Sequence, residues 1–417
     1  KRGCCSPDFG SGFCNSPFDF LLTFYPHILV MENKFICDRC SNSDEKYLGI
    51  GVDGKVYCRR CLPFSGTKVD PSAFTISPMS SPKLRLAYPL TEKQEEIAVK
   101  VRESYKKNIP VLINAVTGAG KTELVYMAME EALKEGKRVG FATPRKDVVL
   151  ELGPRIEEAF PSAKVVCVCE GHTEDLYGHI IVLTSHQLYR YPHYFDLLVF
   201  DEIDAFPYRG DDLLHKFFKD SIRGTYVLLS ATPSKDDLNF IEKEKGIVLK
   251  LDERYHGRPL PVPVFKRCLF FQFLYVLLDL KRMLNQGKQV FVFAPTIREV
   301  ETLYEKLSLF LSNGESVSSQ DGDREKKIRE FKEGKLRYLV TTSILERGVT
   351  VKNLQVLVYK ADTNYIYNAD TLIQIAGRAG RKKKYEDGEV VFYGAIKNKY
   401  IIESIERIKK SNGEQVL

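Results

Sequence analysis

A short glycine-rich segment constrains the fold of this chain more than any other feature. It reads Ala-Val-Thr-Gly-Ala-Gly-Lys-Thr over residues 115–122 and follows an apolar run at 111–116. A helical pattern over residues 121–134 comes directly after it. In such a strand–loop–helix unit the glycines let backbone N–H groups point at phosphate oxygens, and the helix N-terminus adds positive potential. The segment therefore predicts an α/β fold that binds a nucleoside triphosphate.

The residues of this loop have separate predicted roles. Lys121 is expected to reach the β- and γ-phosphates, and Thr122 is expected to ligate Mg²⁺. Ala115 stands where the strict pattern has Gly, and a chance glycine-rich turn is the alternative to a nucleotide site. The predicted ATP contacts of this loop are Thr117, Gly118, Ala119, Gly120, Lys121, Thr122 and Glu123.

An acidic pair follows a second apolar run. Asp201 and Glu202 come directly after residues 195–200, and Asp201 follows Lys121 by 80 residues. The carboxyl ends of parallel strands are where α/β sheets bind ligands. Asp201 is therefore predicted to hold Mg²⁺, and Glu202 is predicted to activate the attacking water as a general base.

Two further motifs are expected to couple hydrolysis to movement. Ser230, Ala231 and Thr232 end an apolar run, where hydroxyl groups are able to bond the acidic pair and relay its state; an ordinary helix cap is the alternative. Arg378 and Arg381 lie in a later glycine-containing segment and would share one face of a helix. Guanidinium groups suit the transition-state charge on a γ-phosphate, so both are predicted to be catalytic. A solvated basic loop is the alternative.

The alternation of strand-like and helical runs predicts two α/β lobes with parallel sheets. A segment with three prolines, residues 253–267, interrupts the alternation. We expect an irregular extension over 1–34, a cysteine-rich unit over 35–64, a Ser/Pro-rich linker over 65–88, and lobes over 89–255 and 256–417. The runs that predict strands are 111–116, 139–143, 164–168, 180–184, 197–201, 226–231, 289–294, 336–341, 355–359 and 389–393.

Four cysteines form two CxxC pairs near the start of the chain. Cys37 and Cys40 are followed, after seventeen residues, by Cys58 and Cys61. This spacing fits a site in which four thiolates bind one Zn²⁺. Two disulfides are the alternative, which is less expected beside the signature of an intracellular ATPase. We therefore predict that all four cysteines are zinc ligands.

Composition sets looser bounds. The formal net charge of +7 permits a polyanionic partner without proving one. The most apolar stretches, residues 18–31 and 268–280, contain polar residues and are shorter than the roughly 18–20 apolar residues of a membrane-spanning helix. We therefore expect a cytoplasmic protein with no transmembrane segment of its own. Met31 is a candidate native start.

The motifs, in this order, resemble helicase superfamily 2. The phosphate loop and segments 201–204, 230–232, 341–348 and 374–381 resemble its motifs I, II, III, V and VI. Gln94 resembles the upstream glutamine that reads adenine, since an amide both donates and accepts. The resemblance also makes Gly348 and Gln374 candidate nucleotide contacts, and it implies two RecA-like lobes.

One family resembles the chain more closely, from about residue 31 to the end: the late competence ComFA family of Gram-positive bacteria. The resemblance rests on the cysteine unit and on AVTGAGKTE, DEIDAFPY, ERYHGRPL, TTSILERGVT and LIQIAGRAGR. It implies an ATP-dependent single-stranded DNA translocase or helicase that drives uptake of transforming DNA at the inner face of the cell membrane. It also implies ComFC, DprA and the ComEC uptake channel as partners.

Contacts with DNA follow from the resemblance less directly. Hydroxyl and guanidinium groups at strand ends suit phosphate contacts, which position a strand without reading its sequence. The predicted DNA contacts are Thr143, Arg145, Thr184, Gln187 and Thr296. Three tyrosines are candidates for base stacking, although packing in the core explains them better: Tyr189, Tyr191 and Tyr194.

Three other functions compete with this interpretation. A replication-restart or recombination helicase of the PriA or RecG type shares the GRAGR motif and would unwind forked DNA. An RNA helicase often has His where this chain has Gln374, which argues weakly for DNA. A binding module with an inactive motor requires a lost catalytic residue, yet Lys121, Asp201 and Glu202 are all present.

Overall fold

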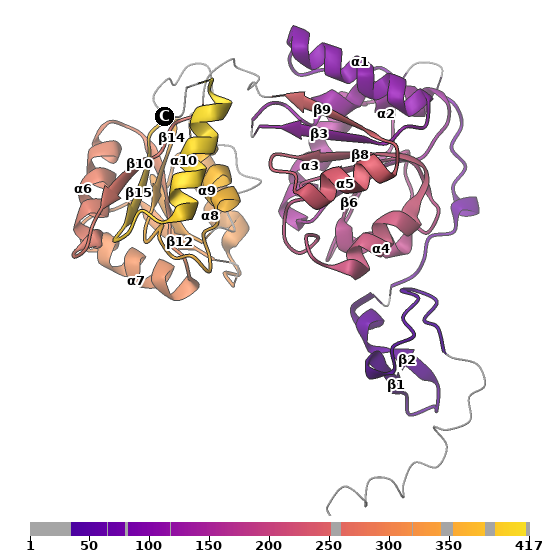
Figure 1. Ribbon diagram of the computed structural model, residues 1–417, viewed down its shortest axis with the longest axis horizontal. Helices are drawn as coiled ribbons and strands as arrows, with labels where there is room; N and C mark the ends of the chain where they lie inside the picture. The colour runs from indigo at the N-terminus through magenta and orange to yellow at the C-terminus, as the bar shows by residue number, and fades with distance from the viewer. Residues whose placement is uncertain are drawn as a thin grey trace, which may run out of the picture. The chain divides into compact units, whose positions relative to one another are not determined.

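The computed structural model describes residues 35–64, 66–79, 82–116, 118–251, 260–318, 320–342, 353–379 and 388–413. The chain divides into two compact units, with the boundary between Ser65 and Gly66. The second unit contains both α/β lobes (Figure 1). The predicted extension over residues 1–34 lies outside the described residues, as do three predicted site residues: Thr117, Gly348 and Arg381.

The first unit is a small hairpin with a thin core. Strands β1 (Leu48–Ile50) and β2 (Val56–Cys58) are antiparallel, and a 3-10 helix, η2 (Arg59–Phe64), follows them. The hydrophobic cluster of this unit consists mainly of its cysteines, with Phe35 and Leu48 packed against it. So few large apolar side chains give little stabilisation to a unit of this size.

The sheet of lobe 1 has seven parallel strands in the order β5-β6-β4-β7-β8-β3-β9. Strands such as β4 and β6 are buried along their whole length, which is typical of a parallel sheet covered on both faces. The strands are β3 (Val111–Ala115), β4 (Val139–Thr143), β5 (Val165–Val168), β6 (Ile180–Thr184), β7 (Phe195–Asp201), β8 (Ile222–Ser230) and β9 (Ile247–Leu251).

Helices cover both faces of this sheet (Figure 1). One face packs against α1 (Glu92–Lys106), α2 (Tyr126–Lys134) and α3 (Lys146–Ala159) in a continuous apolar core. On the other face, Phe218 of α4 (Asp212–Ser221) lies 5.5 Å from the ring of Phe200. Tyr226 of β8 stacks at 6.1 Å on Phe240 of α5 (Lys235–Lys243).

Lobe 2 repeats this plan with six parallel strands in the order β10-β15-β14-β11-β13-β12. Alternate residues of β11 face opposite sides: Phe291 and Phe293 join one hydrophobic cluster, and Val290 and Val292 join the other. The strands are β10 (Val264–Arg267), β11 (Gln289–Phe293), β12 (Gly314–Val317), β13 (Tyr338–Thr341), β14 (Leu354–Val358) and β15 (Val390–Gly394).

The helices of lobe 2 divide between the two faces of its sheet. Helices α8 (Arg324–Lys332), α9 (Ala369–Ala376) and α10 (Lys399–Ser411) pack on the face with Phe291. Helices α6 (Gln272–Asn285) and α7 (Ile297–Ser308) pack on the face with Val290. The prediction of two RecA-like parallel α/β lobes is confirmed.

The Ser/Pro-rich segment that we expected to be a linker lies against lobe 1 along its described residues. Val69 is buried, and its N–H donates to the Arg190 carbonyl at 2.7 Å. Further along, Met79 N–H donates to the Leu133 carbonyl at 3.1 Å. Leu84 packs against the core of the lobe together with Met79. An extended, proline-rich segment makes few hydrogen bonds within itself, so its contacts with lobe 1 hold it in place. We call this Ser/Pro-rich segment the strap.

Candidate functional site

The phosphate loop joins β3 to α2 in lobe 1. Gly118 and Gly120 have φ angles of 83° and 72°, a region that glycine adopts far more readily than other residues. A Cβ on Gly120 would also lie 2.8 Å from Nε2 of Gln94. The loop continues into a 3-10 turn, Glu123–Val125, before α2 begins. The sequence therefore places glycines where the loop has positive φ.

Gln94 lies directly against this loop, as its predicted role requires. It caps α1 through its Oε1, which accepts from the Thr91 N–H at 2.9 Å. Its Nε2 donates to the Ala119 carbonyl at 2.7 Å, and the residue is 1% exposed. The amide thus holds the loop to α1, while the adenine contact stays a prediction.

The acidic pair lies at the carboxyl end of β7. Only one strand, β8, lies between β7 and β3 in the sheet, so the carboxyl end of β7 lies near the phosphate loop that follows β3. Burial raises the pKa of Asp201 to about 6, the charge of Lys121 opposes the rise, and Glu202 adds to it. Oxygen ligands at such a position suit Mg²⁺, so Asp201 and the Thr122 hydroxyl fit the predicted metal contacts. Glu202 has a left-handed φ of 60°, a strained conformation of the kind found at functional sites.

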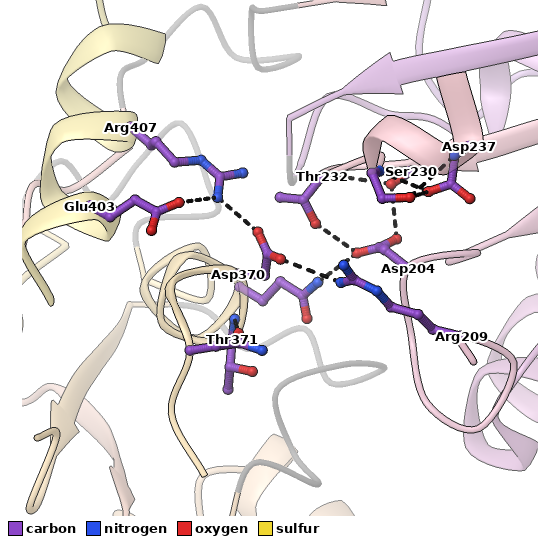
Figure 2. A network of polar contacts seen from close by, with 12 residues as sticks. Asp204, Arg209, Ser230, Thr232, Asp237, Asp370, Thr371, Glu403 and Arg407 are labelled. Carbon is purple, nitrogen blue, oxygen red and sulfur yellow. Dashed lines mark hydrogen bonds and ion pairs between the residues drawn. The ribbon is translucent and has the colours of Figure 1, made fainter. Parts of the chain in front are cut away.

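A third acid, Asp204, accepts the hydrogen bonds that we expected Ser230 and Thr232 to donate to this pair. Ser230 Oγ and Thr232 Oγ1 each donate to an oxygen of Asp204 at 3.0 Å (Figure 2). The expectation that they bond Asp201 and Glu202 is wrong, because residue 204 lies closer to the end of β8. The Ile203 N–H donates to the Leu229 carbonyl of β8 at 3.4 Å, which keeps residue 204 beside the end of that strand.

Lobe 2 reaches the same carboxylate. Gln374 on α9 donates through Nε2 to Asp204 Oδ2 at 2.9 Å. Nearby, Arg209 of lobe 1 lies 3.5 Å from Asp370 of α9, and Arg407 of α10 donates to the other oxygen of Asp370 at 2.8 Å (Figure 2). Gln374, predicted as a nucleotide contact, is thus bonded to the acidic segment of the other lobe.

Arg378 departs from its expected setting. Helix α9 ends at Ala376, so Arg378 lies in the turn that follows instead of on a helical face. It is only 4% exposed, which excludes the alternative of a solvated basic residue at this position. Arg381 lies outside the described residues, so the pairing of the two arginines stays a prediction.

The predicted DNA contacts of lobe 1 gather at one edge of its sheet. Thr143 and Thr184 end the adjacent strands β4 and β6 and are register partners. Both are buried. Arg145 follows as the N-cap of α3, and Gln187 accepts a hydrogen bond from Arg190 Nε at 2.6 Å.

Two hydroxyls at this edge have no partner among the described residues, although they are buried: Thr143 Oγ1 and Ser185 Oγ. Buried polar groups are normally bonded, so a polar ligand such as a phosphate is a fitting partner. Thr296, in lobe 2, instead caps α7 through the Glu299 N–H at 3.3 Å. The three tyrosines pack in the core, as expected: Tyr189, Tyr191 and Tyr194.

The four cysteines of the first unit gather at one point. The sulfur of Cys37 lies 3.7 Å from that of Cys61, and the sulfur of Cys40 lies 3.7 Å from that of Cys58. All four lie within 4.8 Å of one another. Sulfurs bound to one tetrahedral zinc ion at about 2.3 Å would be about 3.8 Å apart. The cluster therefore fits a zinc ion.

Comparisons with known proteins agree with this geometry. Residues 87–235 match the family described as "Type III restriction enzyme, res subunit", and residues 271–383 match the "Helicase conserved C-terminal domain". The chain is 33% identical to the competence protein ComFA of Bacillus subtilis over 92% of its length and 87% of that protein. The chain belongs to the ComFA family.

A second ComFA, from Streptococcus pneumoniae, is 32% identical over 92% of the chain and 91% of that protein. Membership of the ComFA family makes the chain a competence protein of the helicase or translocase type and an ATPase of superfamily 2, as predicted. The fold is also that of S. cerevisiae Dbp5, solved with RNA and ADP BeF3. That structure has a TM-score of 0.61 at 17% identity and covers 78% of this chain and 93% of Dbp5.

Sequence reasoning missed two residues of the candidate site. Asp204 was visible as the last acid of DEID, but nothing in the sequence shows that three donors converge on it. Ser185 follows Thr184 at the strand end, and its burial was the missing information. None of the helices in the described part of the chain combines the length and the apolar character that crossing a bilayer requires.

Proposed function

We propose that this protein couples ATP hydrolysis to movement along single-stranded DNA, and that this movement drives uptake of transforming DNA during competence. The observation that carries the proposal is the junction at Asp204. This carboxylate of lobe 1 accepts hydrogen bonds from Ser230 and Thr232 at the end of β8 and from Gln374 on α9 of lobe 2. A change at the acidic segment therefore reaches lobe 2 through a single side chain.

The chemistry is assigned to lobe 1. Lys121 neutralises phosphate charge, and Glu202 accepts the proton of the attacking water. Mg²⁺, held by Thr122 and Asp201, offsets the negative charge of the triphosphate. At the same carboxyl end of the sheet, where β4 ends beside β7, Thr143 contacts backbone phosphates of the strand, which gives binding with little preference for base sequence.

The test is ATP turnover measured with and without single-stranded DNA, with Lys121→Ala as the inactive control. We expect stimulation by DNA and its absence in the control. The DNA affinity should fall with salt, with a slope of log K against log salt of about −0.7 per phosphate neutralised. Stimulation by RNA alone would favour an RNA helicase, and robust unwinding of forked duplexes would favour a replication-restart helicase. Binding to ComFC, DprA and ComEC at the inner membrane face belongs to the same proposal.

We also propose that the first unit holds one Zn²⁺ through Cys37, Cys40, Cys58 and Cys61. The support is the sulfur geometry together with the thin apolar core of the unit. In zinc-finger peptides the metal contributes about 10–16 kcal/mol of apparent binding energy, most of which is folding energy. The metal is therefore expected to supply most of the stability of this unit.

Metal analysis of the full chain tests the zinc site. Cys58→Ser should lose the metal and unfold the first unit, while DNA-free ATP turnover survives because the lobes have their own cores. Cys167→Ser is the matched control, since Cys167 lies in lobe 1 and its weak bond to the Val149 carbonyl is one that serine also makes. Stoichiometric zinc in Cys58→Ser would show that the ligands are assigned incorrectly.

A further inference from the structure

A cavity of about 520 Å³ lies beside the Asp204 junction, and no residue of the phosphate loop lines it. Residues of both lobes line it, and neither Lys121 nor the pair Asp201 and Glu202 is among them. The lining residues that bear on its chemistry are Arg145, Phe206, Arg209, Asn368, Tyr400 and Glu403. The cavity therefore contains none of these three catalytic candidates and shares Asp204 and Gln374 with the junction.

Phe206 is the unusual residue of this cavity. Its side chain is 80% exposed, whereas Ala205 before it and Tyr208 after it are buried at 3% and 6%. The Tyr208 ring packs at 4.2 Å on Phe200 and at 4.4 Å on His215, which anchors the loop to the lobe. The packing of Tyr208 thus anchors the loop while the ring of Phe206 stays exposed to solvent.

The other walls supply polar and charged groups, basic at Arg145 and Arg209 and acidic at Asp204, Asp370 and Glu403. Tyr400 lies in the first turn of α10, and Lys399 Nζ lies 4.9 Å from the centre of its ring. Arg145, the N-cap of α3, follows Thr143 at the edge assigned to backbone phosphates. The carboxylate of Glu403 and the amide of Asn368 offer acceptors and donors. An exposed aromatic face with polar groups around it and cations beside it matches a nucleobase attached to its phosphodiester.

We propose that this cavity takes one unpaired base of the single strand, stacked on Phe206, with Arg145 on a neighbouring phosphate. The inference rests on the proposed function and names where that function holds a base. Phe206 follows Asp204 by two residues, so a base in the cavity acts on the segment that accepts the hydrogen bond from Gln374. The strand would then report its presence to the inter-lobe junction through the same loop.

The experiment compares two oligomers of equal length, oligo-deoxythymidine and an oligomer in which every nucleotide is abasic. Both keep the phosphates, and only the first has bases. Phe206→Ala should bind oligo-deoxythymidine about 5- to 150-fold more weakly than the wild type, the range for loss of one base–aromatic stack. On the abasic oligomer the two proteins should bind about equally, and Phe206→Tyr should restore binding to oligo-deoxythymidine.

Phe270→Ala is the matched control, because Phe270 is also largely exposed, at 77%, and does not line the cavity. It should bind both oligomers like the wild type. Equal losses of Phe206→Ala on both oligomers would overturn the stacking proposal and assign the loop to backbone contacts. Wild-type binding of oligo-deoxythymidine with no effect of Phe206→Ala would overturn it while leaving the proposed function intact. A wild type that binds neither oligomer would overturn both.

Discussion

Each lobe has an aspartate whose pKa its surroundings shift, and the two pKa values are shifted in opposite directions. In lobe 1, burial raises the pKa of Asp201 to about 6, with a smaller contribution from the acids that follow it in the chain. The charge of Lys121 opposes this rise without cancelling it. Asp201 is thus a carboxylate whose charge is incompletely compensated by the chain, as expected of a residue that serves a cation and a triphosphate.

In lobe 2, Asp279 of α6 has its charge satisfied. Burial raises its pKa, but the bonds from Lys266, Tyr393 and Arg282 outweigh burial, and the pKa lies below its ordinary value. The distances are 2.7 Å from Lys266 Nζ, 2.6 Å from Tyr393 OH and 3.2 Å from Arg282 Nη2. Asp279 is therefore a structural acid.

The lobes share one architecture, so the difference comes from what stands at the strand ends. No described strand of lobe 2 ends in an acidic pair like that of β7. Lobe 2 instead contacts the acidic segment of lobe 1 from α9, through the hydrogen bond of Gln374 to Asp204. The comparison fits our proposal that lobe 1 carries the reaction, and it predicts that lobe 2 responds to the reaction and completes it.

The strongest test of this division is Arg378→Ala. If lobe 2 completes the reaction, turnover should fall by about 10³-fold or more, as for other arginine fingers. ATP affinity should change little, because the charge that Arg378 meets develops in the transition state. Arg378→Lys keeps the charge without the planar fork and should recover part of the rate. Equal losses in affinity and rate would give lobe 2 a plain binding role.

The next test lies in lobe 1. Glu202→Gln should lower turnover by about 10²- to 10⁴-fold, because an amide cannot accept the proton of the attacking water. ATP binding and thermal stability should be retained. Glu315→Gln in lobe 2, an acid paired with Lys327, is the matched control and should keep near wild-type turnover. Comparable losses in both variants would erase the distinction between the lobes.

A smaller effect is expected at the junction between the lobes. Gln374→Ala removes a hydrogen bond to a carboxylate, a contact worth about 1.5–3 kcal/mol, so DNA-stimulated turnover should fall roughly tenfold or more. Gln374→Glu sets a carboxylate against Asp204 and should cost more than the alanine variant. Gln286→Glu, at the exposed end of α6, controls for the added charge. Equal turnover in the alanine and glutamate variants would mean that the junction does not transmit the state of Asp204.

Central strands of both sheets could be predicted from the sequence, whereas some edge strands could not. All ten predicted runs are strands, because central parallel strands are continuous apolar segments. The three strands of the two lobes that we missed, β9, β10 and β12, are edge strands with partly exposed residues. Strand β10 also follows the prolines that we interpreted as a break. Half-exposed edges give a weak periodic signal.

The candidate site likewise contains features that the local sequence predicts and features that it does not. Gln94 and the acidic pair lie where the motifs predicted, because strand ends and helix caps are fixed by local sequence. The partner of Ser230, the partner of Gln374 and the cavity at Phe206 depend on how a loop follows β8 and on contact between lobes. No local pattern contains that information. The strap over lobe 1 was missed for the same reason.

The smallest predicted effect concerns stability and returns to the two aspartates. Tyr393→Phe removes one of the bonds that hold Asp279 ionised, a buried bond to a charged group worth about 1.5–3 kcal/mol. The free energy of unfolding of lobe 2 should fall accordingly at neutral pH. Turnover of the folded protein should not change, since this network does not contact the ATP site.

The pH dependence distinguishes this account from simple loss of packing. A carboxyl whose folded pKa is lowered stabilises the protein above its unfolded pKa of about 3.9, and this stability is lost as the pH falls through the folded value. The gap between wild type and Tyr393→Phe should therefore shrink as the pH drops below about 4. Tyr304→Phe is the control, because its hydroxyl donates to the neutral Gly314 carbonyl at 3.1 Å. The smaller destabilisation of Tyr304→Phe should be the same at neutral pH and below about pH 4. If the destabilisation of Tyr393→Phe were also independent of pH, the charge of Asp279 would play no part.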